Sequence, residues 1–406
     1  MSSLSAAANK GLCVLAFSGG LDTSWCVSYL QEQGFEVATV TVDTGGFDAA
    51  EQARIAGLSS SLGAVSHHYV DAREELWRDG LRYLLYGNVL RGQLYPLSVS
   101  AERVCQARRI ALAARDLGAK AIAHGSTGAG NDQVRFDVAF RALCPDAELI
   151  TPIRSLALSR EQELADLAER GVEVPARAKT YSVNEGMWGT SVGGKETHDS
   201  WQSLPDSAWP GGIVDQNLAA QTLLLGFDKG QPVSIDGLSA DPVQLIDQLN
   251  TLGSRFGIGR GIHLGDTILG IKGRVGFEAP AAHLLIAAHR ELEKLVLSGK
   301  QLFWKESMGS VYGSLIHEGH AFDPLGRDLE AFLESTQQRV SGEVRLLLRP
   351  HAFEVQGVRS PHSLMQSKIA SYGEGSNAWS GAEAAGYAKI FGIAQQVSLA
   401  AGEGSQ

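Results

Sequence analysis

The sequence predicts an α/β fold with a doubly wound parallel sheet in its N-terminal domain, followed by an α+β domain and a C-terminal helix. Three observations support this prediction. Short apolar runs alternate with helical stretches up to about residue 150. A glycine-rich loop follows the first apolar run, and another follows the fourth. Beyond residue 172 the alternation stops, and short strands mix with long helices. Strands that alternate with helices form parallel βαβ units.

The four apolar runs of the first domain are predicted to be its strands. They are "GLCVLAF" at 11–17, "EVATVTV" at 36–42, "SHHYVD" at 66–71 and "KAIAHG" at 120–125. Helices are predicted over 22–33, 48–63, 72–90 and 100–119, with another beginning near residue 131. In such a sheet, ligands bind beyond the carboxyl ends of the strands, where the strand order reverses.

The rest of the chain is predicted to be less regular. The helical pattern breaks at 172–182, and 183–212 is rich in Gly, Ser, Trp and Pro, which indicates a long, ordered, irregular segment. Strands are predicted within 231–237 and 343–357, and helices over 241–252, 279–297 and 325–339. The last thirty or so residues predict a helix that packs on a neighbouring subunit and ends in a frayed tail. We therefore divide the chain into 1–172, 173–370 and 371–406.

Composition and charge narrow the class of protein. The chain has 406 residues and a net charge of −10, which argues against a nucleic-acid partner because phosphates are bound mainly by Lys and Arg. No apolar run reaches transmembrane length, and "SGG" at 18–20 ends the N-terminal apolar stretch. We therefore expect a first strand rather than a signal peptide, no membrane contact and a cytoplasmic protein. The four cysteines (Cys13, Cys26, Cys105, Cys144) form no CxxC pair, and we expect reduced, mostly buried thiols.

The segment "SGGLDTS" at 18–24 stands where the first strand ends and a helix begins. Its glycines leave backbone amides open, and free amides at the positive end of a helix dipole make a phosphate site. A plain tight turn, with Ser18 or Asp22 capping the helix, explains the same residues equally well. The segment lacks the GxxxxGK[ST] pattern of a P-loop.

A second glycine-rich loop, "HGSTGAGNDQVRFD" at 124–137, follows the fourth strand. A flexible loop capped into a helix would not explain its polar side chains at Thr127, Asn131, Asp132 and Arg135. Since these lie within one loop and one helical turn, we expect them to converge on one small polar ligand. A third relevant strand end, "VDTGG" at 42–46, closes the second strand beside the first, and an adenine or ribose is expected there.

Five segments, in order along the chain, resemble those of the argininosuccinate synthase family. They are "AFSGGLDTS", "HGSTGAGNDQVRF", "YSVNEGMWGTS", "GIGRGIH" and "GYAKIFG". The first also resembles the pyrophosphate-binding loop of the ATP pyrophosphatase superfamily. The resemblance implies a nucleotide-binding domain of the HUP type, a synthetase domain and a C-terminal helix that locks a homotetramer. It also implies a ligase of arginine biosynthesis that uses ATP and Mg²⁺. AMP is transferred to the ureido oxygen of citrulline, and the amine of aspartate then displaces AMP.

The resemblance assigns site residues to three substrates. For ATP they are Ala16, Phe17, Ser18, Gly19, Gly20, Leu21, Asp22, Thr23, Ser24, Val42, His124, Gly125, Gly128 and Gly130. For aspartate they are Thr127, Asn131 and Asp132. For the acceptor they are Tyr95, Ser100, Asn131, Arg135, Ser182, Ser191, Gly265 and Phe277. Asp132, Arg135 and Asp22 are expected to act in catalysis. No residues are expected to bind a metal ion as a set of ligands.

Two of these positions depart from the family pattern. Gly265 and Phe277 stand where the family usually has a Glu and a Tyr that contact the amino end of citrulline. Either a nearby group such as Asp266 or Glu185 replaces the Glu, or the acceptor's nitrogen is uncharged because it is acylated. In the second case, Gly265 and Phe277 would leave an apolar, roomier pocket.

A further departure is Ala129, which stands where the family often has Lys. Arg103, Arg108 and Arg109 are candidates to supply that charge, and solvated helix charges are the alternative explanation for them.

Rival functions have less support. Sulfur transfer to tRNA needs a persulfide cysteine and a basic surface, and a glutamine-dependent synthetase needs a glutaminase domain. A non-catalytic nucleotide-binding regulator would not need the set at Thr127, Asn131 and Asp132. "HEGH" at 317–320 lacks the HExxH spacing of a zinc site, and we expect it to form a loop.

Overall fold

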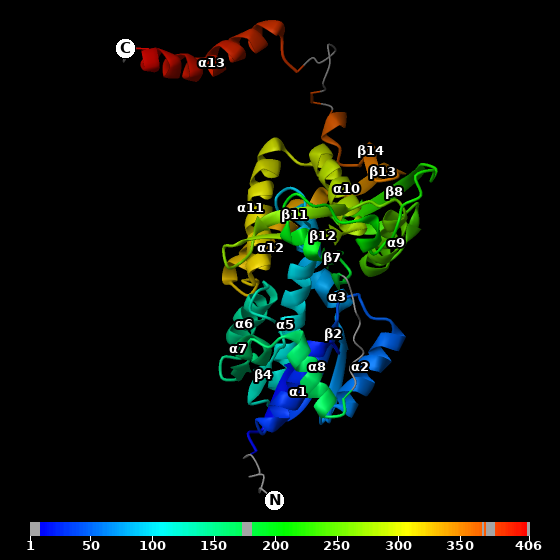
Figure 1. Ribbon diagram of the computed structural model, residues 1–406. Helices are drawn as coiled ribbons and strands as arrows, with labels where there is room; N and C mark the ends of the chain where they lie inside the picture. The colour runs from blue at the N-terminus through cyan, green and yellow to red at the C-terminus, as the bar shows by residue number, and fades with distance from the viewer. Residues whose placement is uncertain (1–8, 173–180, 368, 371–377, 404–406) are drawn as a thin grey trace, which may run out of the picture.

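The computed structural model describes residues 9–172, 181–367, 369–370 and 378–403. Its N-terminal domain contains a five-stranded parallel sheet in the order β3-β2-β1-β4-β5 (Figure 1). The strands are β1 (Leu12–Ala16), β2 (Glu36–Asp43), β3 (Ser66–Asp71), β4 (Ala121–Ala123) and β5 (Glu148–Ile150). The four predicted strands are confirmed. The fifth was not predicted, since three residues are too few to make an apolar run.

Helices cover both faces of this sheet, because alternate residues of a strand point to opposite sides. In β1, Cys13 and Leu15 pack in one core with Trp25, whereas Val14 packs in the other core with Ile110. The helices are α1 (Leu21–Glu32), α2 (Ala49–Ser61), α5 (Ser98–Asp116), α6 (Asp132–Leu143), α7 (Pro152–Leu156) and α8 (Arg160–Glu169). The predicted doubly wound sheet is therefore confirmed, and its order reverses between β1 and β4.

Two antiparallel sheets form the second domain, in the orders β10-β9-β8-β13-β14 and β11-β12-β7-β6. The strands are β6 (Ser182–Asn184), β7 (Thr190–Gly193), β8 (Gln221–Asp228), β9 (Gln231–Ile235), β10 (Leu238–Ser239), β11 (Arg260–Asp266), β12 (Lys272–Glu278), β13 (Gly342–Arg349) and β14 (Ala352–Arg359). The long helices are α9 (Pro242–Arg255), α10 (Pro280–Val296), α11 (Gly299–Glu318) and α12 (Pro324–Thr336). Four 3₁₀ turns complete it: η2 (Lys195–His198), η3 (Asp206–Ala208), η4 (Gln337–Arg339) and η5 (Leu364–Gln366). The predicted α+β class is confirmed.

Three predictions for this domain need correction. Part of the stretch 183–212, expected to be irregular, forms the β6–β7 hairpin, whose strands are too short to show a period. Residues 343–357 form two paired strands rather than one, turning at His351, whose φ is +60°. "HEGH" is not a loop, because His317 and Glu318 end α11 and the left-handed Gly319 terminates it. The predicted break at 172–182 falls mostly on residues 173–180, outside the described residues.

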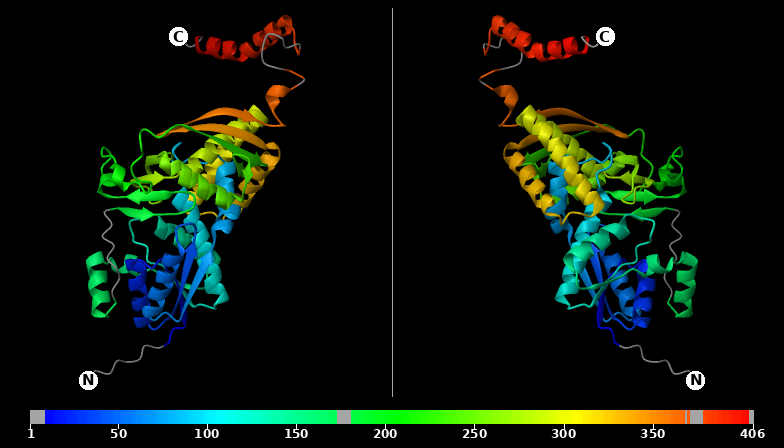
Figure 2. Two further views of the ribbon diagram at one scale, coloured as in Figure 1. Left: turned by 90° about the vertical axis from the view of Figure 1, so that its right-hand side faces the viewer. Right: turned by 90° about the vertical axis from the view of Figure 1, so that its left-hand side faces the viewer.

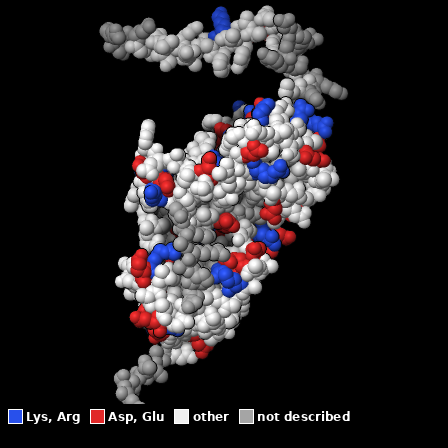
Figure 3. Space-filling model, turned by 45° about the vertical axis from the view of Figure 1, so that its right-hand side comes forward, with Lys and Arg blue, Asp and Glu red and all other residues white. Residues whose placement is uncertain are grey.

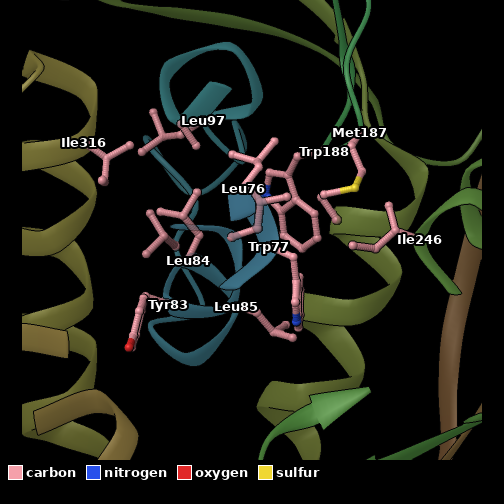
Figure 4. Packing of buried hydrophobic residues seen from close by; sticks show 14 of the residues in the cluster. Leu76, Trp77, Tyr83, Leu84, Leu85, Leu97, Met187, Trp188, Ile246 and Ile316 are labelled. Atoms are coloured by element: carbon pink, nitrogen blue, oxygen red, sulfur yellow. The ribbon is translucent and has the colours of Figure 1, made fainter. Parts of the chain in front are cut away.

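A segment of the first domain leaves the sheet and packs into the second. It comprises α3 (Arg73–Leu76), a π-helical turn η1 (Trp77–Leu81) and α4 (Arg82–Tyr86). Its side chains lie between Ile316 of α11 and Ile246 of α9 in one continuous core (Figure 4). The backbones meet closely where α4 ends, since a Cβ on Gly87 would lie 3.0 Å from the Cα of Gly309. The single helix predicted over 72–90 is therefore interrupted, and tertiary packing sets its course.

A buried polar network lies behind this segment. Glu293 of α10 and Lys305 of α11 form an ion pair of 2.8 Å, and both side chains are almost fully buried. Asn88 donates to Glu293 at 2.6 Å, and Gln337 donates to it at 2.8 Å. The ring of His289 contacts Asn88 and Gln337, each at 2.8 Å. The network therefore joins the end of the α4 segment to α10, α11 and η4.

The C-terminal helix α13 (Gly381–Glu403) projects away from the two domains (Figures 1 and 2). Large apolar side chains along it are exposed, among them Tyr387, Ile390, Phe391, Val397 and Leu399. On the face shown in Figure 3, acidic and basic residues are interspersed over the two domains, and the helix carries few charges. No helix in the described part of the chain is long and apolar enough to cross a membrane. The four thiols are free, and three of them are buried, as predicted.

Candidate active site

The two glycine-rich loops lie side by side at the carboxyl ends of β1 and β4. These strands are neighbours at the point where the strand order reverses, which is the usual ligand site of an open α/β sheet. A Cβ on Gly125 would lie 3.3 Å from the Cγ2 of Thr23 and from the backbone of Asp22. The loops therefore form one continuous surface.

The first loop offers open hydrogen-bond donors. Ser18 and Gly20 are exposed, and Gly20 is the N-cap of α1, with no side chain capping the helix. Ser18 Oγ lies 3.2 Å from Thr23 Oγ1 and accepts a 3.4 Å hydrogen bond from the amide of Gly20, which leaves the amides of the first helical turn without a side-chain cap. Helix capping by Ser18 or Asp22, the alternative explanation of this loop, is therefore not observed. Uncapped amides at a helix N-terminus attract anions.

The other predicted residues of this loop pack in the protein interior beneath it. Phe17, Leu21 and Ser24 are buried, and Ala16 is half-buried. The carbonyl of Phe17 accepts a 2.6 Å hydrogen bond from Thr41. These residues hold the loop rather than present side chains to a ligand.

Replacing Gly19 with Ala is expected to raise the KM for ATP roughly tenfold, by analogy with the cost of other strained backbone positions. Gly19 has φ +66°, and its Cβ would lie 2.9 Å from Ile55 Cγ1, so the loop must shift. Steady-state kinetics at saturating levels of the other substrates measures the change. Gly57→Ala, on α2 with nothing within 4 Å, is the control and should leave the KM unchanged. An unchanged KM for Gly19→Ala would show that ATP does not bind this loop.

Asp22 faces Glu163 of α8. Burial and the neighbouring Asp22 raise the pKa of Glu163 to about 8, so Glu163 is protonated at neutral pH and hydrogen-bonds with Asp22. No sequence pattern indicates this pair, because Glu163 lies in an ordinary amphipathic helix far along the chain. The contact keeps one carboxylate at the edge of the phosphate loop.

The carboxyl end of β2 borders the first loop on its other side. Asp43 accepts hydrogen bonds from the Gly45 amide at 2.7 Å and from the Tyr69 hydroxyl at 2.5 Å, which fixes the turn at 43–46. Val42 is largely buried. This strand end therefore offers a ligand backbone groups rather than the Val42 side chain.

The second loop is supported by His124 and open at its tip. His124 is buried, and its Nε2 lies 2.8 Å from Asp137, while its Nδ1 accepts from the Ser126 amide at 3.2 Å. The His124 ring therefore anchors the loop and does not face a ligand. Residues 127–130, which include Thr127, Gly128 and Gly130, are exposed. Gln133 donates to the carbonyl of Gly128.

A cluster of charged side chains stands where the second loop enters α6. Asp132 accepts hydrogen bonds from Arg103 of α5 and from Arg135, each at 2.9 Å. Burial disfavours the charge of Asp132, but the two arginines outweigh it and lower its pKa. Asp132 is therefore an anion that bridges two guanidinium groups.

Arg135 connects this cluster to the second domain. It donates to the carbonyl of His317 at 2.9 Å, and its NH2 lies 3.3 Å from the Nδ1 of His317. Burial and the charge of Arg135 lower the pKa of His317 to about 3, so the ring is neutral. Asn131 makes a second link, because its Oδ1 accepts a 2.9 Å bond from the Ile268 amide. His317 belongs to the "HEGH" segment at 317–320, which was expected to form only a loop.

Of the three arginines considered as replacements for a lysine at Ala129, only Arg103 reaches the cluster. It also bonds Gln106 at 2.9 Å and Asn184 at 3.3 Å. Arg108 pairs with Asp79, and Arg109 pairs with Glu75, away from both loops.

The predicted acceptor residues gather around the start of α5 and the β6–β7 hairpin. Tyr95 is buried, with its hydroxyl 3.4 Å from Ser98. Ser100 is buried, and its hydroxyl has no hydrogen-bond partner among the described residues. Ser191 lies on β7, 3.5 Å from Asn184, and Ser182 lies on β6, where it pairs with Gly193. The structure thus places these serines and Tyr95 on neighbouring elements.

Gly265 and Phe277 do not form one pocket. In the β11–β12 ladder Gly265 pairs with Gly273, whereas Phe277 pairs with Gly261. Phe277 is fully buried, with ring centroids 5.2 Å from Tyr95 and 5.8 Å from His283.

The space beside Gly265 is also filled. A Cβ there would lie 2.5 Å from the Nε2 of His263, whose ring stacks on Tyr95 at 5.5 Å. The expectation of a roomier apolar pocket is therefore wrong, because a histidine and a packed core occupy both places. Asp266 pairs with Lys272 at 2.6 Å, and Glu185 is exposed, so the structure singles out neither as the replacement carboxylate.

No group of three or more His, Cys, Asp or Glu side chains that could hold a metal ion occurs among residues 9–172, 181–367, 369–370 and 378–403. Single carboxylates at the loops, Asp22 above all, remain the acidic groups that could contact a cation carried by a ligand.

Two families match successive parts of the chain. The family described as "Arginosuccinate synthase N-terminal HUP domain" matches residues 12–173, and "Arginosuccinate synthase C-terminal domain" matches residues 181–398. An argininosuccinate synthase of Xanthomonas campestris is 42% identical over 394 residues, covering 94% of this chain and 96% of that protein. One from Xanthomonas axonopodis is 41% identical, covering 94% and 92%. One from Dictyoglomus turgidum is 38% identical over 383 residues, covering 94% and 95%.

Proposed function

This chain belongs to the argininosuccinate synthase family and is an ATP-dependent ligase of arginine biosynthesis, and from that premise we propose how its residues divide the reaction. The observation that carries the proposal is the Arg103–Asp132–Arg135 cluster. It stands where the second loop and the start of α6 meet α11 and the β11–β12 turn of the second domain, and the first loop contacts the second loop at Gly125. All three substrates can therefore meet at this junction.

ATP is proposed to bind along the first loop, from Ala16 to Ser24, with Val42 and the loop at 124–130 beside it. The ureido carbon of the acceptor is a poor electrophile, because two nitrogens donate electrons into it. Transfer of AMP to the ureido oxygen converts that oxygen into a good leaving group and releases pyrophosphate. The amide of Gly19, the hydroxyl of Ser18 and the uncapped amides of the first turn of α1 are proposed to stabilise the charge that develops on pyrophosphate.

Aspartate is proposed to bind at Thr127, Asn131 and Asp132. Asp132 is ionised, so it can attract the ammonium group of the incoming aspartate. Arg135, buried beside it, is proposed to hold a substrate carboxylate or to stabilise developing charge. Catalysis of this kind rests on positioning and electrostatics, and no covalent enzyme nucleophile is needed.

The acceptor is proposed to be citrulline, held by Tyr95, Ser100, Ser182 and Ser191 together with Asn131 and Arg135. Ser182 and Ser191 belong to the β6–β7 hairpin of the second domain, and the other residues lie on or beside α5 and α6 of the first. Neither Gly265 nor Phe277 is proposed to contact the acceptor, because His263 and the core around Tyr95 fill those places.

Mg²⁺ is proposed to enter with ATP. This ion is commonly held by one or two carboxylates together with substrate phosphates. Asp22, with Glu163 behind it, offers such a carboxylate beside the phosphate loop. When bound, Mg²⁺ neutralises charge on the polyphosphate.

The homotetramer and the domain division are likewise proposals. Exposed apolar side chains along α13 favour its packing on a neighbouring subunit. The division at 1–172, 173–370 and 371–406 follows the chain, although the α3–α4 segment packs with the second domain in space. A cytoplasmic location and the lack of a nucleic-acid partner stay predictions.

The test is pyrophosphate release with ATP, Mg²⁺ and aspartate, in the presence of citrulline, N-acetylcitrulline or no acceptor. The kcat/KM for citrulline is expected to be at least about tenfold higher than that for N-acetylcitrulline. The acetylated form loses a charged hydrogen bond, and such a loss lowers affinity by about that factor or more. Removal of Mg²⁺ with EDTA should stop turnover. Higher activity with N-acetylcitrulline would identify an acylated acceptor, and ATP binding without turnover would favour a regulator.

A further inference from the structure

Glu102, on the second turn of α5, is a buried acid that the reaction described above does not use. Its side chain is 1% exposed, and its Oε1 is buried without a hydrogen-bond partner among the described residues. The backbone of Trp188 hydrogen-bonds with the carboxyl group. No ion pair to Glu102 occurs in the described part of the chain, so its Oε1 has no bonded partner there, and the charge of Arg103 acts on Glu102 only through space.

The surroundings of Glu102 are those of the acceptor site. Its carboxyl group lies against Gly186, where a Cβ would overlap it, in the turn of the β6–β7 hairpin. That hairpin carries Ser182 and Ser191, and α5 itself carries Ser100, whose hydroxyl also lacks a hydrogen-bond partner among the residues that the structure describes. Glu102 therefore lies between two elements that supply proposed acceptor contacts.

The charges near Glu102 are already paired with one another. Asp132 accepts from both Arg103 and Arg135, at 2.9 Å each, and Arg103 also bonds Gln106 and Asn184. Among the described residues, no Lys, Arg or His side chain forms an ion pair with Glu102, and the nearby Arg103 is engaged by Asp132. A buried carboxylate without a partner is costly, and a cation brought by a ligand would remove that cost.

We propose that Glu102 receives the ammonium group of the acceptor, which is therefore a ureido acid with a free α-amine. This inference rests on the proposed function of the site. A residue that only filled the space beside Gly186 would need no charge. Glutamine has nearly the same shape as Glu102 and would cost less free energy to bury there. The binding step is an ion pair in which Glu102 loses its proton to solvent and the ammonium keeps its own.

The proposal predicts that the affinity for citrulline depends on pH. Burial raises the pKa of Glu102 to about 8 in the free protein, with Arg103 opposing the rise. Below that pH, the carboxyl group must lose a proton before it can pair with an ammonium, so citrulline affinity should rise with pH from 6.5 to about 8. The facing groups do not titrate in this range. The pKa of Asp132 is lowered, those of Tyr95 and Arg103 are raised, and those of His263 and His317 are lowered.

Glu102→Gln tests the proposal. We expect the KM for citrulline to rise about 10- to 100-fold with little change in kcat, and its dependence on pH between 6.5 and 8 to disappear. The advantage of citrulline over N-acetylcitrulline should shrink by a similar factor. Glu330→Gln is the matched control, a buried acid with a raised pKa that bonds Tyr312 away from the loops. It should change neither the KM nor the pH profile.

A second measurement needs no variant. Calorimetry of citrulline binding to the unmodified protein at pH 7, in two buffers of different ionisation enthalpy, should show release of close to one proton. Absence of proton release, or a Glu102→Gln protein with unchanged KM and pH profile, would overturn the proposal while turnover itself upholds the proposed function. No turnover with any ureido acid would overturn both.

Discussion

Replacing Asp132 with Ala is expected to lower kcat by at least about 10²-fold while leaving ATP binding largely intact. Asp132 bridges Arg103 and Arg135, so its loss leaves two guanidinium groups facing each other without an anion between them. It also removes the proposed partner of the aspartate ammonium. Asp132→Asn keeps the shape and removes the charge, and it should lose nearly as much.

The measurement combines product formation with ATP binding by calorimetry. Asp146→Ala, an exposed acid just beyond α6, is the matched control and should retain full activity. Loss of nucleotide affinity in Asp132→Ala would show that the aspartate site has been misplaced. Activity within about threefold of the parent protein would remove Asp132 from catalysis altogether.

Replacing Lys305 with Ala is expected to lower the free energy of unfolding by about 3–5 kcal/mol. Lys305 is 1% exposed and pairs with Glu293, which is fully buried and also accepts from Asn88 and Gln337. Without Lys305, a buried carboxylate loses its counter-charge, and a cavity replaces a long side chain. The Tyr86 carbonyl loses a donor as well.

Urea unfolding followed by fluorescence measures this change as a shift of the midpoint. Lys300→Ala, exposed at the start of the same helix, should shift the free energy by no more than about 0.5 kcal/mol. Lys305→Met with Glu293→Gln removes both charges together and should recover much of the loss. A single Lys305→Ala variant as stable as the parent would mean that the buried pair contributes no net stability.

Much of the fold followed from local patterns. The strands at 11–17 and 36–42 are mostly apolar or β-branched runs, that at 66–71 is marked by its place in the alternation of strands and helices, and the structure has all three within one or two residues. β5 and the β6–β7 hairpin were missed because strands of three or four residues carry no measurable period. Helix α11 was missed because its buried residues, Lys305 and His317 among them, include charged and polar side chains. Such residues are buried only because the network and Arg135 provide partners.

The candidate site divides in the same way. Loops such as 18–24 and 124–137 place their groups within a few residues, so a sequence pattern can mark them. Partners far away in the sequence decide what Arg103, Glu102, Glu163 and His317 do. Arg103 bonds Asp132, 29 positions away, and His317 accepts a bond from Arg135, 182 positions away. No local pattern marks a side chain whose role depends on a distant partner.

The sequence by itself determined the class of fold, the two loops and the family, because each depends on short-range patterns or motifs. Only the tertiary structure decided that Gly265 and Phe277 leave no pocket, and that Arg103 rather than Arg108 or Arg109 serves the cluster. It also decided that, among the described residues, Glu102 Oε1 is buried without a hydrogen-bond partner. Burial and charge pairing are properties of elements brought together from the whole chain. They set the free-energy cost of burying each ionised group, and the neighbouring residues in the sequence do not determine that cost.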